Sequence, residues 1–300
     1  MDRRHFLKLA ALAGAGLSVP GGIGQLAEAA EQASRPDLTV VRGGSPDQLA
    51  RSAIEAMGGI RKFIARGDIV VIKPNIGWDR TPEQAGNTNP EVVATVVKLC
   101  FEAGAKKVKV FDRPVNDPRR CYVQSGIAPA VKALGAEADY MDERKFKDMA
   151  INGQALKSWP LYTEIFEADK VINIPIAKHH GLAKLTLSMK NWMGVMGGSR
   201  RQIHQKLDES LVDLSMKIKP TLTILDAVRI LTANGPQGGS LADVKRLDTL
   251  VAGFDPVAID SYGATLFGMK GSDLGYVALG HRLGLGQMDL SRLVIRKISV

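Results

Sequence analysis

Residues 68–112 read DIVVIKPNIGWDRTPEQAGNTNPEVVATVVKLCFEAGAKKVKVFD, and this stretch decides the fold class. It begins at residues 68–73 with a short run of mostly apolar, β-branched side chains, which is typical of a strand buried on both faces of a parallel sheet. A helix then starts after Asn89, a capping residue followed by proline, and ends at Gly104. Residues 107–111 form the next strand. Strand, helix and strand in succession predict a parallel sheet covered by helices.

The same alternation continues on both sides of this unit. Residues 38–42 read as a strand, and a helix follows from Ser45. Beyond residue 112 the pattern predicts a hairpin at 145–160 and further strands at 138–141, 170–174, 221–225, 247–252 and 293–298, with helices between them. We therefore expect an α/β fold in three layers, with a parallel or mixed central sheet and a small β-hairpin insertion. Residues 38–300 form its single domain.

The N-terminal sequence MDRRHFLKLAALAGAGLSVPGG combines a basic head with a weakly apolar run rich in alanine and glycine. Its Arg-Arg-x-Phe-Leu-Lys pattern, which begins at Arg3, resembles a twin-arginine export signal. We expect a signal over residues 1–30, a linker over residues 31–37, and a periplasmic or other extracytoplasmic location. The alternatives are an ordinary amphipathic first helix, or a signal that stays uncleaved as a membrane anchor. Membrane contact is expected only through this signal.

The composition narrows the range of partners and cofactors. The net charge of +9 favours anionic partners, but the basic residues are scattered and aromatic residues make up just 5%, so no nucleic acid is expected. Cys100 and Cys121 are too few for a four-cysteine cluster, so no iron–sulfur cluster is expected within this chain. Twin-arginine export carries folded proteins that often hold a cofactor, yet the identity of any cofactor stays unknown.

Polar residues follow several of the expected strands at the point where each strand ends. Ligands of open parallel sheets bind beyond the carboxyl ends of the strands, here called the carboxyl rim. Residues 171–204 are the richest in such groups, because an apolar run breaks at Pro175 and continues into a basic segment with glycines. We expect two catalytic residues, Lys190 and His179. The expected substrate-binding residues are Lys73, Asn75, Lys178, Asn191, His204 and Asp226.

The types of these residues suit an anionic ligand. Lys73 with Asn75, and Lys190 with Asn191, each combine a point cation with an amide that both donates and accepts hydrogen bonds. Such pairs hold a carboxylate, a phosphate or an enolate. A buried lysine also has a lowered pKa and can exchange protons with a substrate. We expect Lys190 or His179 to move the proton.

Metal binding is the alternative interpretation of the histidines. His179 and His204 could bind one metal ion together with an aspartate. His179 and His180 are adjacent, so only one of them is expected to point into a given site. No His-x-x-x-His or Cys-x-x-Cys spacing is present, and the metal content stays unknown.

Taken together, the motifs over residues 40–270 resemble a bacterial and archaeal family, the domain of unknown function 362. The matching segments are Lys73-Pro74-Asn75, Asn87-Thr88-Asn89-Pro90, the PIAKH segment that starts at Pro175, the KNWMG segment that starts at Lys190, His204, Asp226, and Asp255-Pro256 through Asp260. The family name states no activity. The resemblance implies that many members carry a ferredoxin-like domain with two four-cysteine clusters, which this sequence lacks.

Two functions of different classes follow from these observations. The first is an exported enzyme that binds a small anionic substrate at a site lined by lysine, histidine and asparagine. The second is a non-catalytic binding or accessory protein that serves an iron–sulfur redox partner. The metal content of the purified protein, and the effect of replacing Lys190 or His179, would discriminate between them.

Overall fold

The computed structural model describes residues 35–300, and residues 36–300 form one compact unit. The export signal expected over residues 1–30 lies outside the described residues, as do residues 31–34 of the expected linker. Within the described part of the chain, no helix has the length and apolar character needed to cross a bilayer.

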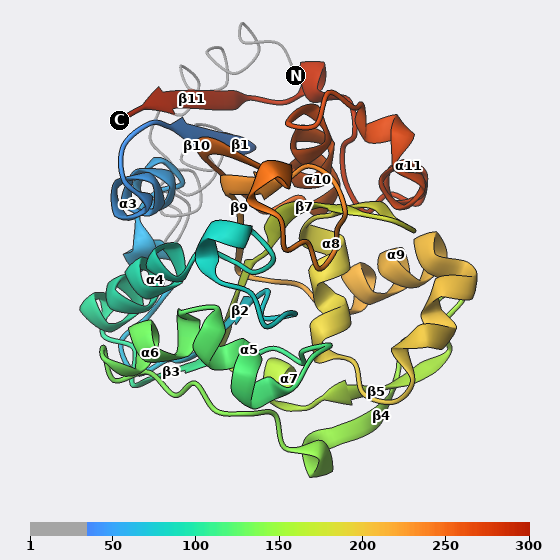
Figure 1. Cartoon of the computed structure of the whole chain (residues 1–300), viewed down its shortest axis with the longest axis horizontal. Coiled ribbons are helices and arrows are strands. Elements are labelled where there is room, and N and C mark those ends of the chain that lie inside the picture. Colours follow the sequence, from blue (N-terminus) through green and yellow to red (C-terminus); the bar gives the residue numbers. More distant parts are fainter. Residues whose placement is uncertain (1–34) are drawn as a thin grey trace, which may run out of the picture. The chain divides into compact units, whose positions relative to one another are not determined.

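A mixed nine-stranded sheet forms the centre of this unit, with the main strand order β11-β1-β10-β9-β6-β2-β3 (Figure 1). Strands β3, β2, β6 and β9 run parallel, whereas β10 is antiparallel to both of its neighbours, β9 and β1. Two short strands off this path, β7 and β8, complete the sheet. The strands are β1 (Leu38–Arg42), β2 (Ile69–Pro74), β3 (Lys107–Val110), β6 (Lys170–Ile174), β7 (Ile176–His180), β8 (Lys184–Thr186), β9 (Leu222–Leu231), β10 (Val244–Gly253) and β11 (Ile295–Ser299).

Helices cover both faces of the sheet (Figure 1). Alternate side chains of one strand enter two separate cores. In β2, for example, Ile72 packs in one core and Val71 in the other. The first face carries α3 (Pro46–Ala56), α4 (Pro90–Ala103), α5 (Pro118–Gln124) and α6 (Ile127–Lys132). The second carries α7 (Glu164–Glu167), α8 (Ser188–Asn191), α9 (Leu207–Lys217), α10 (Pro256–Thr265) and α11 (Gly275–Arg282). The expected three-layer α/β class is therefore confirmed.

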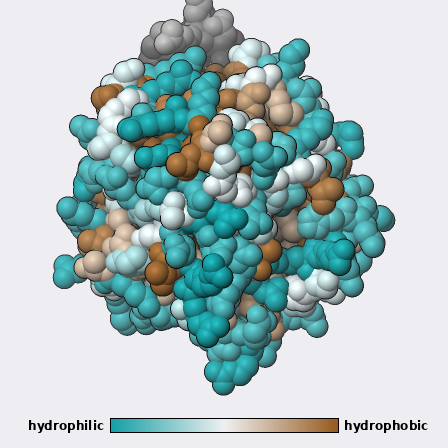
Figure 2. Space-filling view, in the orientation of Figure 1, coloured by the Kyte–Doolittle hydropathy of each residue, from teal (hydrophilic) through white to brown (hydrophobic). Residues whose placement is uncertain are grey.

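The predicted helix starts and the hairpin are present. Asn89 caps α4 by accepting hydrogen bonds from the backbone N–H groups of Glu91 and Val92, and Pro90 occupies the first turn. The hairpin consists of β4 (Phe146–Ala150) and β5 (Ser158–Tyr162), which form a separate two-stranded sheet. Figure 2 shows that the face of the molecule in this view is largely hydrophilic, with apolar residues in small groups.

Three strand predictions differ from the structure. Residues 138–141 form no strand, although Glu137 makes an isolated bridge to Lys109 of β3. Strand β9 was expected to end at residue 225 but continues to Leu231, because β10 pairs along its length and β7, which follows Pro175, pairs with its second half. The segment after Pro175 is thus a strand rather than a loop.

The strand directions determine which polar groups meet at the carboxyl rim. β2, β3 and β6 are parallel neighbours, so residues at their ends lie together. Asp255, which follows β10, does not join them, because β10 runs antiparallel to β9 and ends away from the carboxyl rim. Asp255 instead caps α10 by accepting hydrogen bonds from Val257 N and Ala258 N.

Candidate functional site

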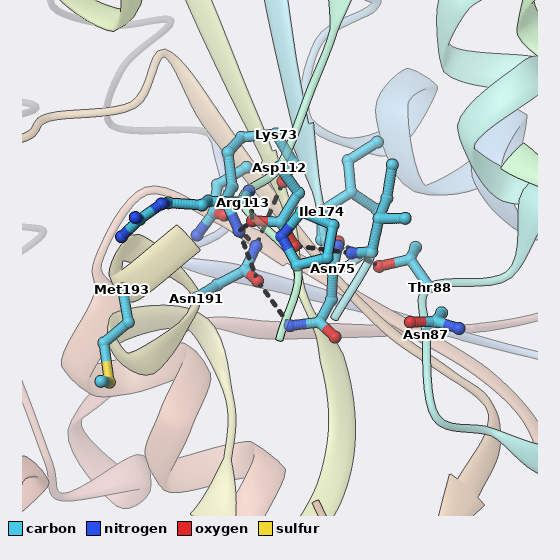
Figure 3. A network of polar contacts seen from close by, with 12 residues as sticks. Lys73, Asn75, Asn87, Thr88, Asp112, Arg113, Ile174, Asn191 and Met193 are labelled. Atoms are coloured by element: carbon cyan, nitrogen blue, oxygen red, sulfur yellow. Dashed lines mark hydrogen bonds and ion pairs between the residues drawn. The ribbon is translucent and has the colours of Figure 1, made fainter. Parts of the chain in front are cut away.

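A buried ion pair lies at the end of β2 and forms the base of the candidate site (Figure 3). Lys73 is fully buried, and its Nζ lies 2.9 Å from Asp112 Oδ1, beyond the end of the neighbouring strand β3. The other carboxylate oxygen of Asp112 accepts a hydrogen bond from Ile76 N at 2.6 Å. Lys73 Nζ also donates to Asn191 Oδ1 at 2.9 Å. A buried charge needs such partners, and both Lys73 and Asp112 have them.

Asn191 of α8 connects the ends of two neighbouring strands, β2 and β6. Its Nδ2 donates to the backbone oxygen of Lys73 at 3.1 Å and to Asn173 Oδ1 of β6 at 2.8 Å. Its Oδ1 accepts from Asn75 Nδ2 at 3.1 Å (Figure 3). Lys178 of β7 joins the network, since its Nζ donates to Asn75 Oδ1 at 3.0 Å. Lys73, Asn75 and Asn191 of the two predicted pairs therefore belong to one network, whereas Lys190 Nζ donates to Met193 Sδ and stays outside it.

A cavity of about 360 Å³ opens beside this network. Its wall is made from the chain after β2, the chain after β3, strands β7 and β8, and the segment from α8 to His204. The lining residues are Asn75, Gly77, Trp78, Asp112, Arg113, Val115, Lys178, His180, Thr186, Lys190, Asn191, Met193, Gly194, Arg200, Arg201, His204 and Pro236. We call it the basic pocket.

The basic pocket holds more positive than negative charge. Lys178, Lys190 and Arg200 line it, whereas the carboxylate of Asp112 is already paired with Lys73. Arg200 donates to backbone carbonyl oxygens of Arg113, Met193 and Pro114, at 2.8, 3.3 and 2.8 Å. Carbonyl groups orient the guanidinium without neutralising its charge. The pocket therefore has an unbalanced positive charge that favours an anion.

Burial changes the protonation of the two lysines that line the pocket. Desolvation, followed by the charge of Lys190, lowers the pKa of Lys178 to about 7. Desolvation, followed by the charge of Arg200, lowers the pKa of Lys190 to about 7. Desolvation also lowers the pKa of Lys73, but the nearby carboxylate of Asp112 opposes this effect. Both lining amines consequently gain or lose a proton near neutral pH, as an acid or base must.

The three histidines of this region occupy different positions. His204 and His180 both line the basic pocket, with their rings stacked at a centroid distance of 6.3 Å. Desolvation and then Lys190 lower the pKa of both, to about 3 for His180. His179 lies elsewhere, in a second pocket with Lys184 and Lys245, and its Nδ1 accepts a hydrogen bond from Gly235 N at 3.0 Å. Adjacent residues of β7 point to opposite faces, so His180 and not His179 reaches the basic pocket.

The structure also places Asp226 away from the pocket. It is buried in the middle of β9, where its carboxylate accepts from Asn89 N at 2.7 Å and Val228 N at 2.9 Å. Its position follows from the length of β9, because the strand continues beyond the residue that was expected to end it. Asp226 thus joins β9 to the start of α4 and does not line the cavity.

The proposed metal ligands do not meet. His179 and His204 line different pockets, and residues 35–300 contain no group of three or more His, Cys, Asp or Glu side chains arranged to hold a metal ion. The pair therefore lacks the third ligand that a metal site needs.

Two contacts hold α8, which carries Lys190 and Asn191, against the strand ends. Asp260 of α10 accepts hydrogen bonds from Ser188 N at 2.7 Å, Ser188 Oγ at 2.5 Å and Met189 N at 3.1 Å. Gly194, in the 3-10 helix that follows α8, packs against the ion pair so closely that a Cβ would lie 1.7 Å from Asp112 Oδ1. A side chain at this position would therefore displace the helix from the ion pair.

The structure brings most of the predicted site residues together in one region. Six of the eight predicted residues take part in the network or line the pocket: Lys73, Asn75, Lys178, Lys190, Asn191 and His204. The lining residues Arg200, Thr186 and His180 were not predicted. The adjacent arginines Arg200 and Arg201 and the adjacent histidines are signals that could have identified two of them, whereas Thr186 lies in an ordinary strand sequence.

Comparison with known proteins identifies the family. The family model "Domain of unknown function (DUF362)" matches residues 70–265. A protein of Synechocystis sp. named as thylakoid-associated is 29% identical over 243 residues, which make up 78% of this chain and 74% of that protein. A crystal structure of a Thermotoga maritima protein has 9% identity and a TM-score of 0.39, over 69% of this chain and only 55% of that one. Because the family match spans well over half of the sequence, the chain belongs to the DUF362 family.

Proposed function

We propose that the chain binds a small anionic substrate in the basic pocket and acts on it as an enzyme. The observation that carries this proposal is the unbalanced charge of the pocket: Lys178, Lys190 and Arg200 line it, while Asp112 is paired with Lys73. Burying cations without counter-ions costs free energy, and a bound anion recovers part of that cost. Such a cost is expected where a function requires it.

The basic residues of the pocket fall into two groups, those that bind the anion and one that faces its reacting part. Lys178 and Arg200 are fixed by carbonyl acceptors, since Lys178 Nζ donates to Gly86 O at 2.6 Å and Arg200 donates to three backbone oxygens. Fixed cations suit the binding of a carboxylate or phosphate group. Lys190 is not fixed in this way and faces the reacting part of the substrate. A cavity of about 360 Å³ suits a ligand of metabolite size.

Inorganic sulfate tests the binding, because it is a small anion whose charge is constant near neutral pH. Sulfate should raise the melting temperature of the protein relative to sodium chloride at the same ionic strength. Lys178→Met should reduce the affinity by about tenfold or more, by removing one of the cations in the pocket. Lys147→Met, at an exposed position in β4, is the matched control and should leave it unchanged.

The proposal fails if sulfate, phosphate and oxalate all bind no better to the native protein than to Lys178→Met. A role as an accessory protein for an iron–sulfur partner would then be the better interpretation. That role predicts co-purification with a protein that carries the cluster.

We also infer that the protein functions outside the cytoplasm. Two observations support this location: the twin-arginine pattern at Arg3 and Arg4, and the Synechocystis relative that is named as thylakoid-associated. Replacing both arginines by lysine should leave the protein in the cytoplasmic fraction. Arg119 and Arg120 form the same dipeptide on exposed α5, and replacing them by lysine is the matched control. Equal export of both variants would overturn this inference.

A further inference from the structure

The three buried lysines of the site differ in what their amines contact. Lys73 Nζ is paired with Asp112 and Asn191, and Lys178 Nζ donates to two oxygen atoms. Among the described residues, the only hydrogen-bond acceptor of Lys190 Nζ is the thioether sulfur of Met193 at 3.5 Å. A thioether is a weak acceptor and carries no charge. Lys190 is therefore the one amine of the three without an oxygen partner.

Its surroundings favour the neutral form of this amine. Lys190 is nine-tenths buried and lines the basic pocket beside the guanidinium of Arg200. Burial without an anionic partner, together with neighbouring cations, stabilises an amine over an ammonium group. A neutral lysine amine has a free lone pair, and lysines activated in this way attack carbonyl carbons. Lys190 thus has the surroundings of a nucleophile.

Two further polar atoms in the pocket are free to assist. In the part of the chain that the structure describes, Thr186 Oγ1 and His204 Nδ1 are buried atoms with no hydrogen-bond partner. Both residues line the same pocket as Lys190. Buried polar groups are normally paired, so unpaired ones on residues that line a cavity are consistent with a ligand that brings its own donors and acceptors. A carbonyl or hydroxyl oxygen on the ligand would satisfy them.

We propose that Lys190 forms an imine with the carbonyl carbon of a small oxo acid, whose carboxylate is held by Lys178 and Arg200. This inference rests on the proposed anion-binding function and names the class of substrate. The oxo acid supplies both features that the pocket requires, because its carboxylate carries negative charge and its carbonyl carbon accepts a nucleophile.

The step balances without any oxidant or reductant. The lone pair of the Lys190 amine attacks the carbonyl carbon, a C–N bond forms, and the carbonyl π electrons move to oxygen. One proton passes from nitrogen to that oxygen, which gives a carbinolamine. The second N–H proton then passes to the hydroxyl oxygen as the C–O bond breaks, water leaves, and the nitrogen lone pair closes the C=N bond. His204 and Thr186, which line the same pocket, are the side chains that would carry these protons. Amine and carbonyl become imine and water.

Reductive trapping tests the proposal on the full chain. The protein is incubated at pH 7 with glyoxylate or pyruvate and sodium cyanoborohydride, which reduces an imine to a stable carboxymethyl or carboxyethyl lysine. Peptide mass spectrometry then gives the labelling rate of each lysine. Lys190 should react at least about tenfold faster than exposed Lys147, because a far larger fraction of its amine is neutral. Sulfate should protect Lys190 and leave the rate at Lys147 unchanged.

Two variants make the result specific. Lys190→Arg keeps a basic side chain of similar length but has no neutral amine, so it should lose the fast label while its melting curve shows that it folds. Lys178→Met should slow labelling of Lys190 by pyruvate, since it removes a carboxylate contact and leaves the nucleophile in place. Fast labelling of Lys178 in place of Lys190 would overturn the proposal.

The proposal and the function on which it rests can fail separately. If sulfate stabilises the protein but glyoxylate labels Lys190 no faster than Lys147, the imine is excluded and anion binding stands. If sulfate does not bind and Lys190 is not labelled, both are wrong. Preferential labelling of Lys190 that sulfate suppresses supports both.

Discussion

The residues of the site show how one side chain type acquires different properties from its contacts. Lys73, Lys178 and Lys190 are all buried in one region, yet their partners are a carboxylate, two neutral oxygens and a thioether. An ammonium group loses its hydration on burial and keeps its charge only where partners replace that water. Lys73 is therefore a structural cation, whereas the protonation of Lys178 and Lys190 depends on what occupies the pocket.

This difference predicts the pH dependence of anion binding. The pKa of Lys178 and that of Lys190 are both lowered to about 7, mainly by burial, so both amines lose charge as the pH rises through that value. Sulfate needs the charged forms. Its affinity should be highest below pH 7 and should fall above it by up to about tenfold per pH unit for each proton taken up. Titration calorimetry in buffers of different ionisation enthalpy measures this proton uptake directly.

The free energy of unfolding of the protein without a bound anion should depend on pH with the opposite sign to the sulfate affinity. In the unfolded chain both lysines return to the ordinary pKa of 10.5. Between about pH 7 and 10.5 the unfolded state binds more protons, so these two groups make the free energy of unfolding rise with pH. Replacing both lysines by methionine should reduce the pH dependence of the free energy of unfolding and also the pH dependence of sulfate affinity. An unchanged slope in the double variant would show that other groups are responsible.

At the scale of elements, the site depends on the close approach of one short helix to two strand ends. The 3-10 helix Trp192–Val195 brings Gly194 against the ion pair, where a Cβ would lie 1.7 Å from Asp112 Oδ1 and 2.5 Å from Lys73 Nζ. Both neighbours are buried and paired, so they have little room to move. A larger residue must therefore push the helix, and α8 before it, away from the sheet.

Gly194→Ala should consequently weaken sulfate binding by about tenfold or more and destabilise the protein by about 1–3 kcal/mol. Thermal melts with and without sulfate measure both effects. Gly181→Ala is the matched control, because a Cβ at that position in the turn between β7 and β8 meets nothing within 4 Å. Its melting temperature and affinity should match those of the native protein. Equal melting temperatures and equal sulfate affinities of the two variants would contradict the close contact at Gly194.

The strands and their ends explain which parts of the site could be predicted from the sequence. Lys73 and Asn75 follow an apolar strand whose buried, parallel character is evident from its residues, so their position at the rim was predictable. His179 was assigned to the pocket because Pro175 looked like the end of a strand. In the structure Pro175 interrupts the strand for one residue only, between β6 and β7. Once β7 exists, alternation along the strand selects His180.

Other wrong predictions of site residues come from strand pairing, which no local sequence pattern specifies. Asp226 was expected at a strand end, but β9 extends to Leu231 because β7 offers it a second partner. Thr186 reaches the pocket through tertiary contacts, and its own sequence neighbourhood gives no hint of it. Strand composition therefore predicted the layers and the parallel unit, whereas strand order and strand length, which set the outline of the site, had to come from the structure.

In the whole molecule, the central sheet combines a group of parallel strands with strands on one side of it that include the antiparallel β10. Strands β3, β2, β6 and β7 carry the site, and β10, β1 and β11 extend the sheet on the other side. The net charge of +9 adds a long-range attraction for anions to the local charge of the basic pocket. Cores on both faces of one continuous sheet make residues 36–300 a single compact unit.

This unit should fold and bind without the residues that precede it. A protein that begins at residue 36 keeps every strand, because β1 starts at Leu38 and pairs with β10 and β11. It should melt in one transition, within about 3 °C of the full chain, which corresponds to a change of roughly 1 kcal/mol. Its affinity for sulfate should be unchanged.

A protein that begins at residue 43 is the control for this experiment, because it lacks β1. Loss of β1 leaves β11 without the strand to which it is hydrogen-bonded and exposes the edge of β10. Buried Leu38, Val40 and Val41 are lost as well, and removing such side chains costs several kcal/mol in total. This protein should melt far below the other two or fail to fold. If the protein that begins at residue 36 melts equally low, the residues before it contribute to the fold, and the division of the chain at this point is wrong.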